Sequence, residues 1–188
     1  MGDIIYIFLD VDGVLNKKSQ WNTKTISNQL NQSNQTTQNS SQKTILDDEC
    51  IKNFCEFVNQ VKDKYKKDVR IILSSTWRIG FVGSKMEFNS TYIKELENKL
   101  GKYNVEISGK TPIFNNKKFK GELKRDAEID RFLMYERENP HNKGKMIEYI
   151  IIDDDRNEFS YVSKYNYFVD ANFGFTKKDI KDCIRCLH

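Results

Sequence analysis

The sequence predicts an α/β domain in which helices flank a mostly parallel sheet. Its 188 residues suit a single domain, 1–188, with a sizeable core. Short unbroken runs of apolar, β-favouring residues alternate with segments whose apolar residues recur at helical spacing. Unbroken apolar runs are typical of strands that are buried on both faces, as in parallel sheets. Their alternation with helices favours the α/β class.

Five segments carry the strand pattern. The first, residues 4–9, reads Ile-Ile-Tyr-Ile-Phe-Leu and is continuously β-favouring. Three of the later segments are similar and 104–107 is weaker; in chain order these later segments are 69–73, 104–107, 149–152 and 165–169.

Helical patterns lie between these strands, and polar residues mark where the first two helices begin. Either Asp47 or Asp48 can cap a helix whose apolar residues recur from 51 to 61. Ser90 can cap a second helix, which Gly101 would end.

Two more helices are predicted near the carboxyl end of the chain. Ile129, Phe132 and Leu133 mark one of them. Thr176 can cap the other, whose apolar residues recur from 180 to 187.

Residues 27–43 form a low-complexity tract of Asn, Gln, Ser and Thr. Such a tract cannot bury enough apolar area to offset the entropy lost on ordering, so we expect a disordered surface insert. A binding arm or a lid is the functional alternative. An expanded loop without function is favoured, because folds tolerate long surface insertions well.

Composition excludes several classes of protein. The formal net charge of +4 is far from the strong bias of a dedicated nucleic-acid binder. No apolar run approaches the roughly 20 residues that a membrane helix needs, and no signal peptide is visible. We therefore expect a soluble, cytoplasmic protein with no membrane partner.

The cysteines are Cys50, Cys55, Cys183 and Cys186. A zinc site built from the two pairs is one interpretation. The favoured interpretation is reduced, partly buried thiols that pack as small apolar groups within helices.

The first strand ends in Asp10-Val11-Asp12-Gly13, which is the strongest chemical signal in the chain. Residues i and i+2 of a strand lie on the same face, so Asp10 and Asp12 can both point into one site. Gly13 permits a sharp turn there. Two carboxylates held close together repel unless a cation compensates. Mg²⁺, which prefers oxygen ligands, suits this role.

Two further strands end in polar residues. Ser74 and Ser75 follow the strand at 69–73, and hydroxyls with free backbone N–H groups at a strand end can hold phosphate oxygens. Asp153, Asp154 and Asp155 follow the strand at 149–152 and need counter-ions. A metal shared with the first motif would supply the positive charge.

A basic residue could also reach the same site. Either Lys124 or Arg125, at the start of the third helix, could present a positive charge to it, and an ordinary solvated helix start is the alternative that the local pattern leaves open. Binding sites in open α/β sheets form beyond the carboxyl ends of the strands, where all three polar strand ends fall. Their convergence is a stronger signal than any one motif.

These motifs resemble those of the haloacid dehalogenase-like superfamily, whose members are mostly phosphatases. The resemblance rests on residues 8–15, then 73–75, then 152–154, in the order expected for the superfamily. More narrowly, 73–78, Arg125 followed by Glu128-Ile129, and the late Gly174-Phe175-Thr176 resemble haloacid dehalogenase-like domains of RNA-repair proteins. The resemblance implies a Rossmann-like fold and an aspartate-based phosphatase.

The resemblance also implies catalytic roles for the carboxylates. Asp10 would be the nucleophile that forms an aspartyl-phosphate. Asp12 would protonate the leaving group and then activate the hydrolytic water. Mg²⁺ would lie between Asp10, the backbone carbonyl of Asp12, and Asp154, with Asp153 in support.

The remaining implied roles concern the phosphoryl group. Ser74 would bind it, helped by a backbone N–H near Ser75. Arg125 would be the basic residue of the family, with Lys124 as second choice. The metal and the basic residue would neutralise the negative charge on the phosphoryl oxygens, and positioning and electrostatics would dominate the catalysis.

Substrate size is expected to follow from the absence of a substantial cap domain. Segment 79–123 holds about one helix and one strand, which the core fold itself needs. An open site suits nucleic-acid ends or nucleotides, the substrates that the narrower resemblance favours. Trp77 could stack on a base or pack in the core, and Arg78 could pair with a phosphate. A catalytically silent module that binds phosphorylated ligands or nucleic acid is the alternative.

Overall fold

The protein is described by a computed structural model at residues 3–20, 46–82, 87–88, 91–113 and 124–187. Its centre is a five-stranded sheet in the order β5-β2-β1-β6-β7. Every pair of neighbouring strands in this sheet is parallel. The strands are β1 (Ile4–Leu9), β2 (Asp68–Leu73), β5 (Ile107–Lys110), β6 (Ile147–Asp153) and β7 (Asn166–Phe168). The predicted α/β class with a parallel, Rossmann-like sheet is confirmed.

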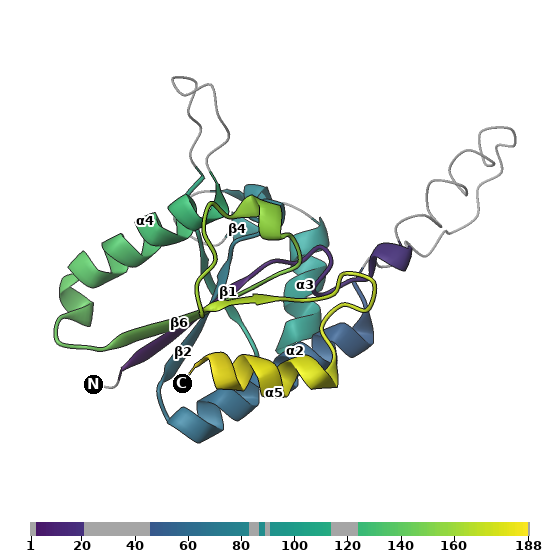
Figure 1. Ribbon diagram of the computed structural model, residues 1–188, viewed down its shortest axis with the longest axis horizontal. Coiled ribbons are helices and arrows are strands. Elements are labelled where there is room, and N and C mark those ends of the chain that lie inside the picture. Colours follow the sequence, from purple (N-terminus) through teal and green to yellow (C-terminus); the bar gives the residue numbers. More distant parts are fainter. Residues whose placement is uncertain (1–2, 21–45, 83–86, 89–90, 114–123, 188) are drawn as a thin grey trace, which may run out of the picture.

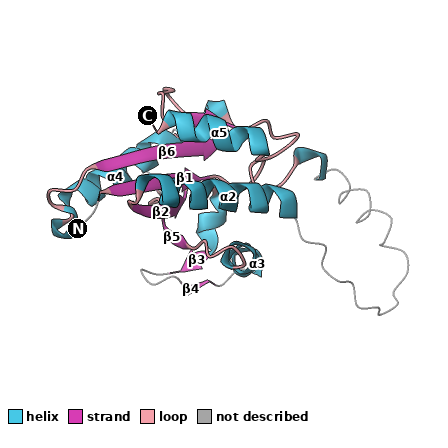
Figure 2. Cartoon of the chain, turned by 90° about the horizontal axis from the view of Figure 1, so that it is seen from below, coloured by secondary structure: helices cyan, strands magenta, loops and turns pink. Residues whose placement is uncertain are grey.

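Four α-helices flank the sheet in the described part of the chain (Figure 1). Helix α4 covers one face, whereas α2 and α5 lie against each other on the opposite face (Figures 1 and 2). The helices are α2 (Asp48–Tyr65), α3 (Thr91–Gly101), α4 (Arg125–Glu138) and α5 (Lys177–Cys186).

Strand β1 lies between two apolar cores, which explains its unbroken apolar sequence. All six of its residues are 0% exposed. Ile5, Ile7 and Leu9 belong to the core that includes residues of α2, α3 and α5. The alternate residues of β1 belong to the smaller core under α4. Because both faces of this strand are covered, no position on it favours a polar residue.

Side-chain hydrogen bonds cap the first and last helices as the sequence predicts. Of the two candidates for α2, Asp47 is the cap: its carboxylate accepts from the backbone N–H groups of Glu49 and Cys50, both at 3.0 Å. Thr176 caps α5 in a reciprocal arrangement with Asp179. Gly101 is the last residue of α3, as expected, and Ser90 lies outside the described residues.

Two local features differ from the sequence-based expectations. Strand β5 was predicted at 104–107 but begins only at Ile107. Asn104 instead adopts a left-handed φ of 56° in the turn that follows α3. Two short antiparallel strands, β3 (Phe81–Val82) and β4 (Glu87–Phe88), were not predicted, since two-residue strands leave no periodic pattern. The predicted insert at 27–43 lies outside the described residues. Within the described residues, no helix has the length and apolar character of a membrane span.

A loop after β7 joins the loop after β1. The backbone N–H of Phe175 donates to the carbonyl of Val14 at 2.8 Å, and Asn53 of α2 donates to the carbonyl of Phe175 at 3.2 Å. Gly174 makes this approach possible because its φ is +64°, and a Cβ there would lie 2.5 Å from the Cys50 sulphur. The late Gly-Phe-Thr motif therefore holds the loop after β1 against the core.

We predict that Gly174→Ala destabilises the fold by about 2 kcal/mol or more, through backbone strain plus overlap with Cys50. Gly144→Ala is the matched control, since Gly144 has a similar φ of +79° but nothing within 4 Å of its added Cβ. It should cost about 1 kcal/mol from strain alone. Urea unfolding measures both values, and equal losses would contradict the close approach at Gly174.

Candidate active site

Strand register brings three polar residues together at one edge of the sheet. Leu9 at the end of β1 is paired with Leu73 of β2 on one side and Ile152 of β6 on the other. The residues that follow these three positions are Asp10, Ser74 and Asp153. The N–H of Asp10 donates to the carbonyl of Ile152, and the N–H of Ser74 donates to that of Leu9, both at 2.9 Å. Hydrogen bonds of the sheet thus fix the three backbones side by side.

Gly13 closes the loop after β1 over the end of β6. Its φ is +76°, and an added Cβ would overlap the Asp154 carboxylate. Only glycine meets both the backbone and the space requirement here. This close approach places Asp154 beside the first motif.

Three carboxylates form a group that suits a metal ion. Oxygens of Asp10, Asp153 and Asp154 all lie within 4.8 Å of one another, and the first two residues are buried. Within the described part of the chain, no other group of three or more His, Cys, Asp or Glu side chains has this spacing. Hard oxygen ligands in such a group fit Mg²⁺. The Asp12 side chain is not part of the group.

The four cysteines, all among the described residues, do not lie together as a group that could hold a metal ion. All four are free thiols, and Cys50, Cys55 and Cys183 are buried. Burial raises the pKa of Cys50 and that of Cys55 to about 12. They pack as small apolar groups, which is the interpretation that the sequence favoured over zinc.

Arg125 is the counter-ion of the buried carboxylates. Its Nη1 lies 2.6 Å from Asp10 Oδ1 and 2.5 Å from Asp153 Oδ2. The guanidinium is itself 10% exposed, so water screens these charges little. Lys124, the other candidate, instead donates to the carbonyl of Asn157. Of the two basic residues that the sequence left open, Arg125 is the one beside Asp10.

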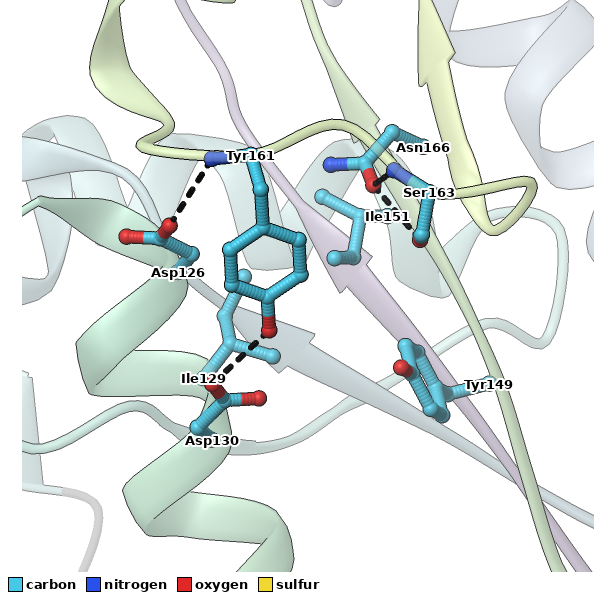
Figure 3. A pocket seen from close by; sticks show the side chains of 8 residues that line it. All are labelled: Asp126, Ile129, Asp130, Tyr149, Ile151, Tyr161, Ser163 and Asn166. Carbon is cyan, nitrogen blue, oxygen red and sulfur yellow. Dashed lines mark hydrogen bonds between the residues drawn. The ribbon is translucent and has the colours of Figure 1, made fainter.

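The neighbouring residue Asp126 anchors the helix start that presents Arg125. Asp126 Oδ2 accepts hydrogen bonds from the backbone N–H groups of Ser160, at 2.8 Å, and Tyr161, at 3.4 Å. Figure 3 shows Asp126 beneath the loop that carries Tyr161, whose hydroxyl reaches Asp130 at 2.9 Å. The loop after β6 is thereby tied to the first turns of α4.

Lys18 is a site residue that the sequence analysis missed. Its Nζ lies 2.9 Å from Asp154 Oδ2, and its backbone N–H donates to the carbonyl of Ala171 at 2.9 Å. The signal available in the sequence was a basic residue soon after the first motif, but no spacing rule distinguishes it from an ordinary surface lysine. Lys18 gives the acidic group a second positive neighbour.

Burial dominates the electrostatics of the nucleophile candidate. Desolvation raises the pKa of Asp10 from 3.8 to about 8; Arg125 opposes this rise, whereas Asp153 and Asp12 add to it. Desolvation also raises the pKa of Asp153, again against the effect of Arg125. At both carboxyls burial outweighs the effect of Arg125, and a bound divalent cation would favour their ionised forms.

Asp12 has a different environment from Asp10. Its Oδ1 accepts from Asn16 Nδ2 at 2.9 Å, and its Oδ2 accepts from the indole Nε1 of Trp77 at 3.0 Å. Both donors are neutral. The two carboxylates of the first motif are therefore held by different kinds of partner, one charged and one neutral.

Ser74 offers a hydroxyl for a ligand. The residue is 0% exposed, and its Oγ has no hydrogen-bond partner among the described residues. A buried hydroxyl without a partner costs free energy unless a ligand or water satisfies it. Ser75 Oγ accepts from the N–H of Trp77 at 3.3 Å. Ser74 therefore fits a phosphoryl oxygen better than Ser75 does.

Arg78 contacts other parts of the protein with both of its terminal nitrogens. Its Nη1 donates to the carbonyls of Ser74 and Ser75, at 2.6 and 2.7 Å, and its Nη2 pairs with Glu128 of α4. The side chain is buried, and these contacts join the end of β2 to α4. Its predicted pairing with a substrate phosphate stays a prediction.

Trp77 is half-buried against the core, which agrees with the packing alternative. Its ring also lies against Tyr92, with 5.8 Å between the ring centroids. Tyr92 is 54% exposed. The hydrogen bond from Trp77 to Asp12 was not anticipated, because a tryptophan four residues beyond a strand carries no pattern that indicates such a partner.

We predict that Asp10→Asn stabilises the metal-free protein, and more so at high pH. A carboxyl whose folded pKa is about 8 retains a proton that the unfolded chain releases above about pH 4. Its contribution to the free energy of unfolding therefore falls as pH rises through that window, and asparagine removes this term.

Urea unfolding with a chelator, between about pH 5 and about pH 8, measures the difference between variant and wild type. Asp63→Asn, at a side chain on α2 that is 83% exposed, is the control and should show no such trend. A stability difference for Asp10→Asn that does not grow with pH would contradict the burial argument.

Comparison with known proteins agrees with the motifs and the fold. The family model for the HAD (haloacid dehalogenase-like) domain in Swiss Army Knife RNA repair proteins matches residues 6–180. Searches of curated proteins and of solved structures gave no significant match. The matched range includes all the strands of the sheet except the first two residues of β1 and contains every residue of the acidic group. The chain therefore belongs to the family of HAD domains found in Swiss Army Knife RNA repair proteins, within the HAD-like hydrolase superfamily.

Proposed function

We propose that the chain is a Mg²⁺-dependent phosphomonoesterase that acts through an aspartyl-phosphate on Asp10. One observation supports the proposal most strongly. Carboxylates close enough together to bind one metal ion lie next to Ser74, because β1 and β2 end side by side, and the buried Ser74 hydroxyl has no hydrogen-bond partner among the described residues. The carboxylates supply ligands for a cation, and the hydroxyl supplies a donor for a phosphate oxygen. An acidic turn without function would require neither.

Asp10 and Asp12 divide the chemistry. An oxygen of Asp10 attacks phosphorus, the bond from phosphorus to the leaving oxygen breaks, and that oxygen takes a proton from Asp12. Asp12, now ionised, then takes a proton from a water that attacks the aspartyl-phosphate. Cleavage of the acyl phosphate releases inorganic phosphate and restores the Asp10 carboxylate.

Fixed positive charge and donors stabilise the phosphoryl oxygens. Arg125 lies beside Asp10, and Ser74 Oγ lies at the end of the adjacent strand. Mg²⁺ held by Asp10, Asp153, Asp154 and the Asp12 carbonyl would neutralise charge on the phosphoryl group. Arg125 Nη1 already contacts Asp10 and Asp153. In this proposal the guanidinium must therefore bind the phosphoryl group while it still contacts Asp10.

The favoured substrates are phosphorylated nucleic-acid ends or nucleotides. The family description, which names RNA repair, supports this choice. Within the described residues of segment 79–123, β5 belongs to the central sheet, and the other elements are α3, the short β3–β4 pair and the end of η2 (Thr76–Gly80). An uncovered site would admit the end of a macromolecule.

The alternative is a catalytically silent module that binds phosphorylated ligands. One observation favours it: the candidate nucleophile Asp10 is already engaged in a buried ion pair with Arg125. Breaking a buried ion pair is costly, so the pair would keep Asp10 from attacking phosphorus unless a substrate or a metal replaces one of its contacts.

We predict that Asp10→Asn lowers the turnover of an aryl phosphate in Mg²⁺ by about four orders of magnitude or more, because the nucleophile is lost. Chelation of Mg²⁺ should abolish turnover by the wild type. Asp63→Asn is the control and should retain full activity.

A screen of nucleotides, 3′- and 5′-phosphorylated oligonucleotides, sugar phosphates and phosphopeptides then identifies the preferred class. Full activity of purified Asp10→Asn would refute the role of the nucleophile. Phosphate-dependent binding without turnover, by folded wild type in Mg²⁺, would favour the silent module.

A further inference from the structure

The two hydrogen bonds on Asp12 hold both of its carboxylate oxygens. Asn16 Nδ2 reaches Oδ1 at 2.9 Å and Trp77 Nε1 reaches Oδ2 at 3.0 Å. A carboxylate with one partner can rotate about its side-chain bonds, whereas two partners on different oxygens fix its plane. Asp12 is therefore pre-oriented before any substrate binds.

Each donor is itself held by the fold. Asn16 Oδ1 accepts from the backbone N–H of Gly13 at 2.7 Å, so its amide is locked onto the same turn as Asp12. The assignment of its amide oxygen and nitrogen follows from this pair of bonds. Asn16 is 1% exposed, which leaves its side chain little freedom to move.

Trp77 is fixed from the opposite side, by the η2 turn (Thr76–Gly80) after β2. Arg78, the next residue, joins the carbonyls of Ser74 and Ser75 to Glu128 of α4 through buried contacts. The N–H that reaches Asp12 thus extends from a turn that is anchored to two other elements.

We infer that Trp77 is a positioning residue for the proton transfers of Asp12, with Asn16 as its counterpart on the other oxygen. The inference rests on the proposed function, since it assigns a task to Trp77 within that mechanism. When the bond from phosphorus to the leaving oxygen breaks, the Asp12 proton must already lie along the line to that oxygen. The indole N–H keeps the carboxyl in that orientation.

The dependence of the rate on the leaving group distinguishes a positioning role of Trp77 from a role in the stability of the fold. A poor leaving group, such as an alkoxide, needs its proton during bond cleavage, whereas dinitrophenolate is stable without one. Loss of orientation at Asp12 should therefore harm alkyl phosphates and spare dinitrophenyl phosphate. A loosened fold would harm both substrates alike.

The decisive variant is Trp77→Phe, which keeps an aromatic ring against Tyr92 and removes only the N–H donor. We expect kcat/KM for glycerol phosphate to fall by about tenfold or more, within the range that general acid catalysis supplies. The value for 2,4-dinitrophenyl phosphate should stay nearly unchanged. The parameter kcat/KM is used because it reports the first chemical step and not the later hydrolysis of the phosphoenzyme.

Tyr92→Leu is the matched control. It disturbs the same ring contact without touching the donors to Asp12, so the ratio of the two kcat/KM values should equal that of the wild type. Equal losses on both phosphates in Trp77→Phe, or no loss on either, would overturn the inference. Absence of turnover of dinitrophenyl phosphate by the wild type would instead refute the proposed function.

A measurement without catalysis tests the contact itself. The chain has two tryptophans, so a nitrogen–proton spectrum contains two indole signals. The signal that Trp77→Phe removes should shift in Asp12→Ala, because its hydrogen-bond acceptor is gone. An unshifted signal in folded Asp12→Ala would show that the indole does not contact Asp12 and would overturn the inference.

Discussion

The site depends on one constraint, the burial of like charges at the end of the central strand. Asp10 and Asp153 are both buried and both contact a single nitrogen of Arg125. Desolvation by burial raises the pKa of Asp10 to about 8, against the opposing effect of Arg125, and the nearby Asp153 adds to the rise. In the proposed function, a bound divalent cation would favour the ionised form of Asp10, which a nucleophile requires. In the proposed function, the burial that costs stability is therefore also the reason that the site needs a cation.

The rest of the fold serves to hold this group of charges in place. Parallel pairing of β1 with β2 and β6 fixes the order of Ser74, Asp10 and Asp153 along one edge, and Gly13 lets Asp154 join them. Contacts outside the group keep the surrounding loops in position, from Asp126 under the Tyr161 loop to the Gly174 loop against Val14. Asp12 stands apart, because neutral donors hold it, which suits the proposed role of a group that both gives and takes a proton.

Sequence reasoning predicted the parts of this arrangement that depend on periodic patterns. Strand β1 could be predicted because burial on both faces demands an unbroken apolar run, and the site because parallel strands end at one edge. The local pattern could not distinguish Lys124 from Arg125, since adjacent residues at a helix start differ only in the direction of their side chains; only the family resemblance favoured Arg125. The contacts of Lys18 and of Trp77 with the aspartates also escaped prediction. Each joins two segments far apart in the chain, and such contacts leave no local pattern.

The central claim is that these strand ends surround one cation and one phosphate-sized anion. X-ray diffraction from crystals grown with Mn²⁺ and tungstate tests it most directly, because anomalous scattering locates both groups independently of the protein. The account predicts a manganese peak among the carboxylates of Asp10, Asp153 and Asp154, with tungstate within hydrogen-bond distance of Ser74 Oγ. Manganese bound elsewhere, or tungstate remote from Ser74 in the presence of bound manganese, would contradict it.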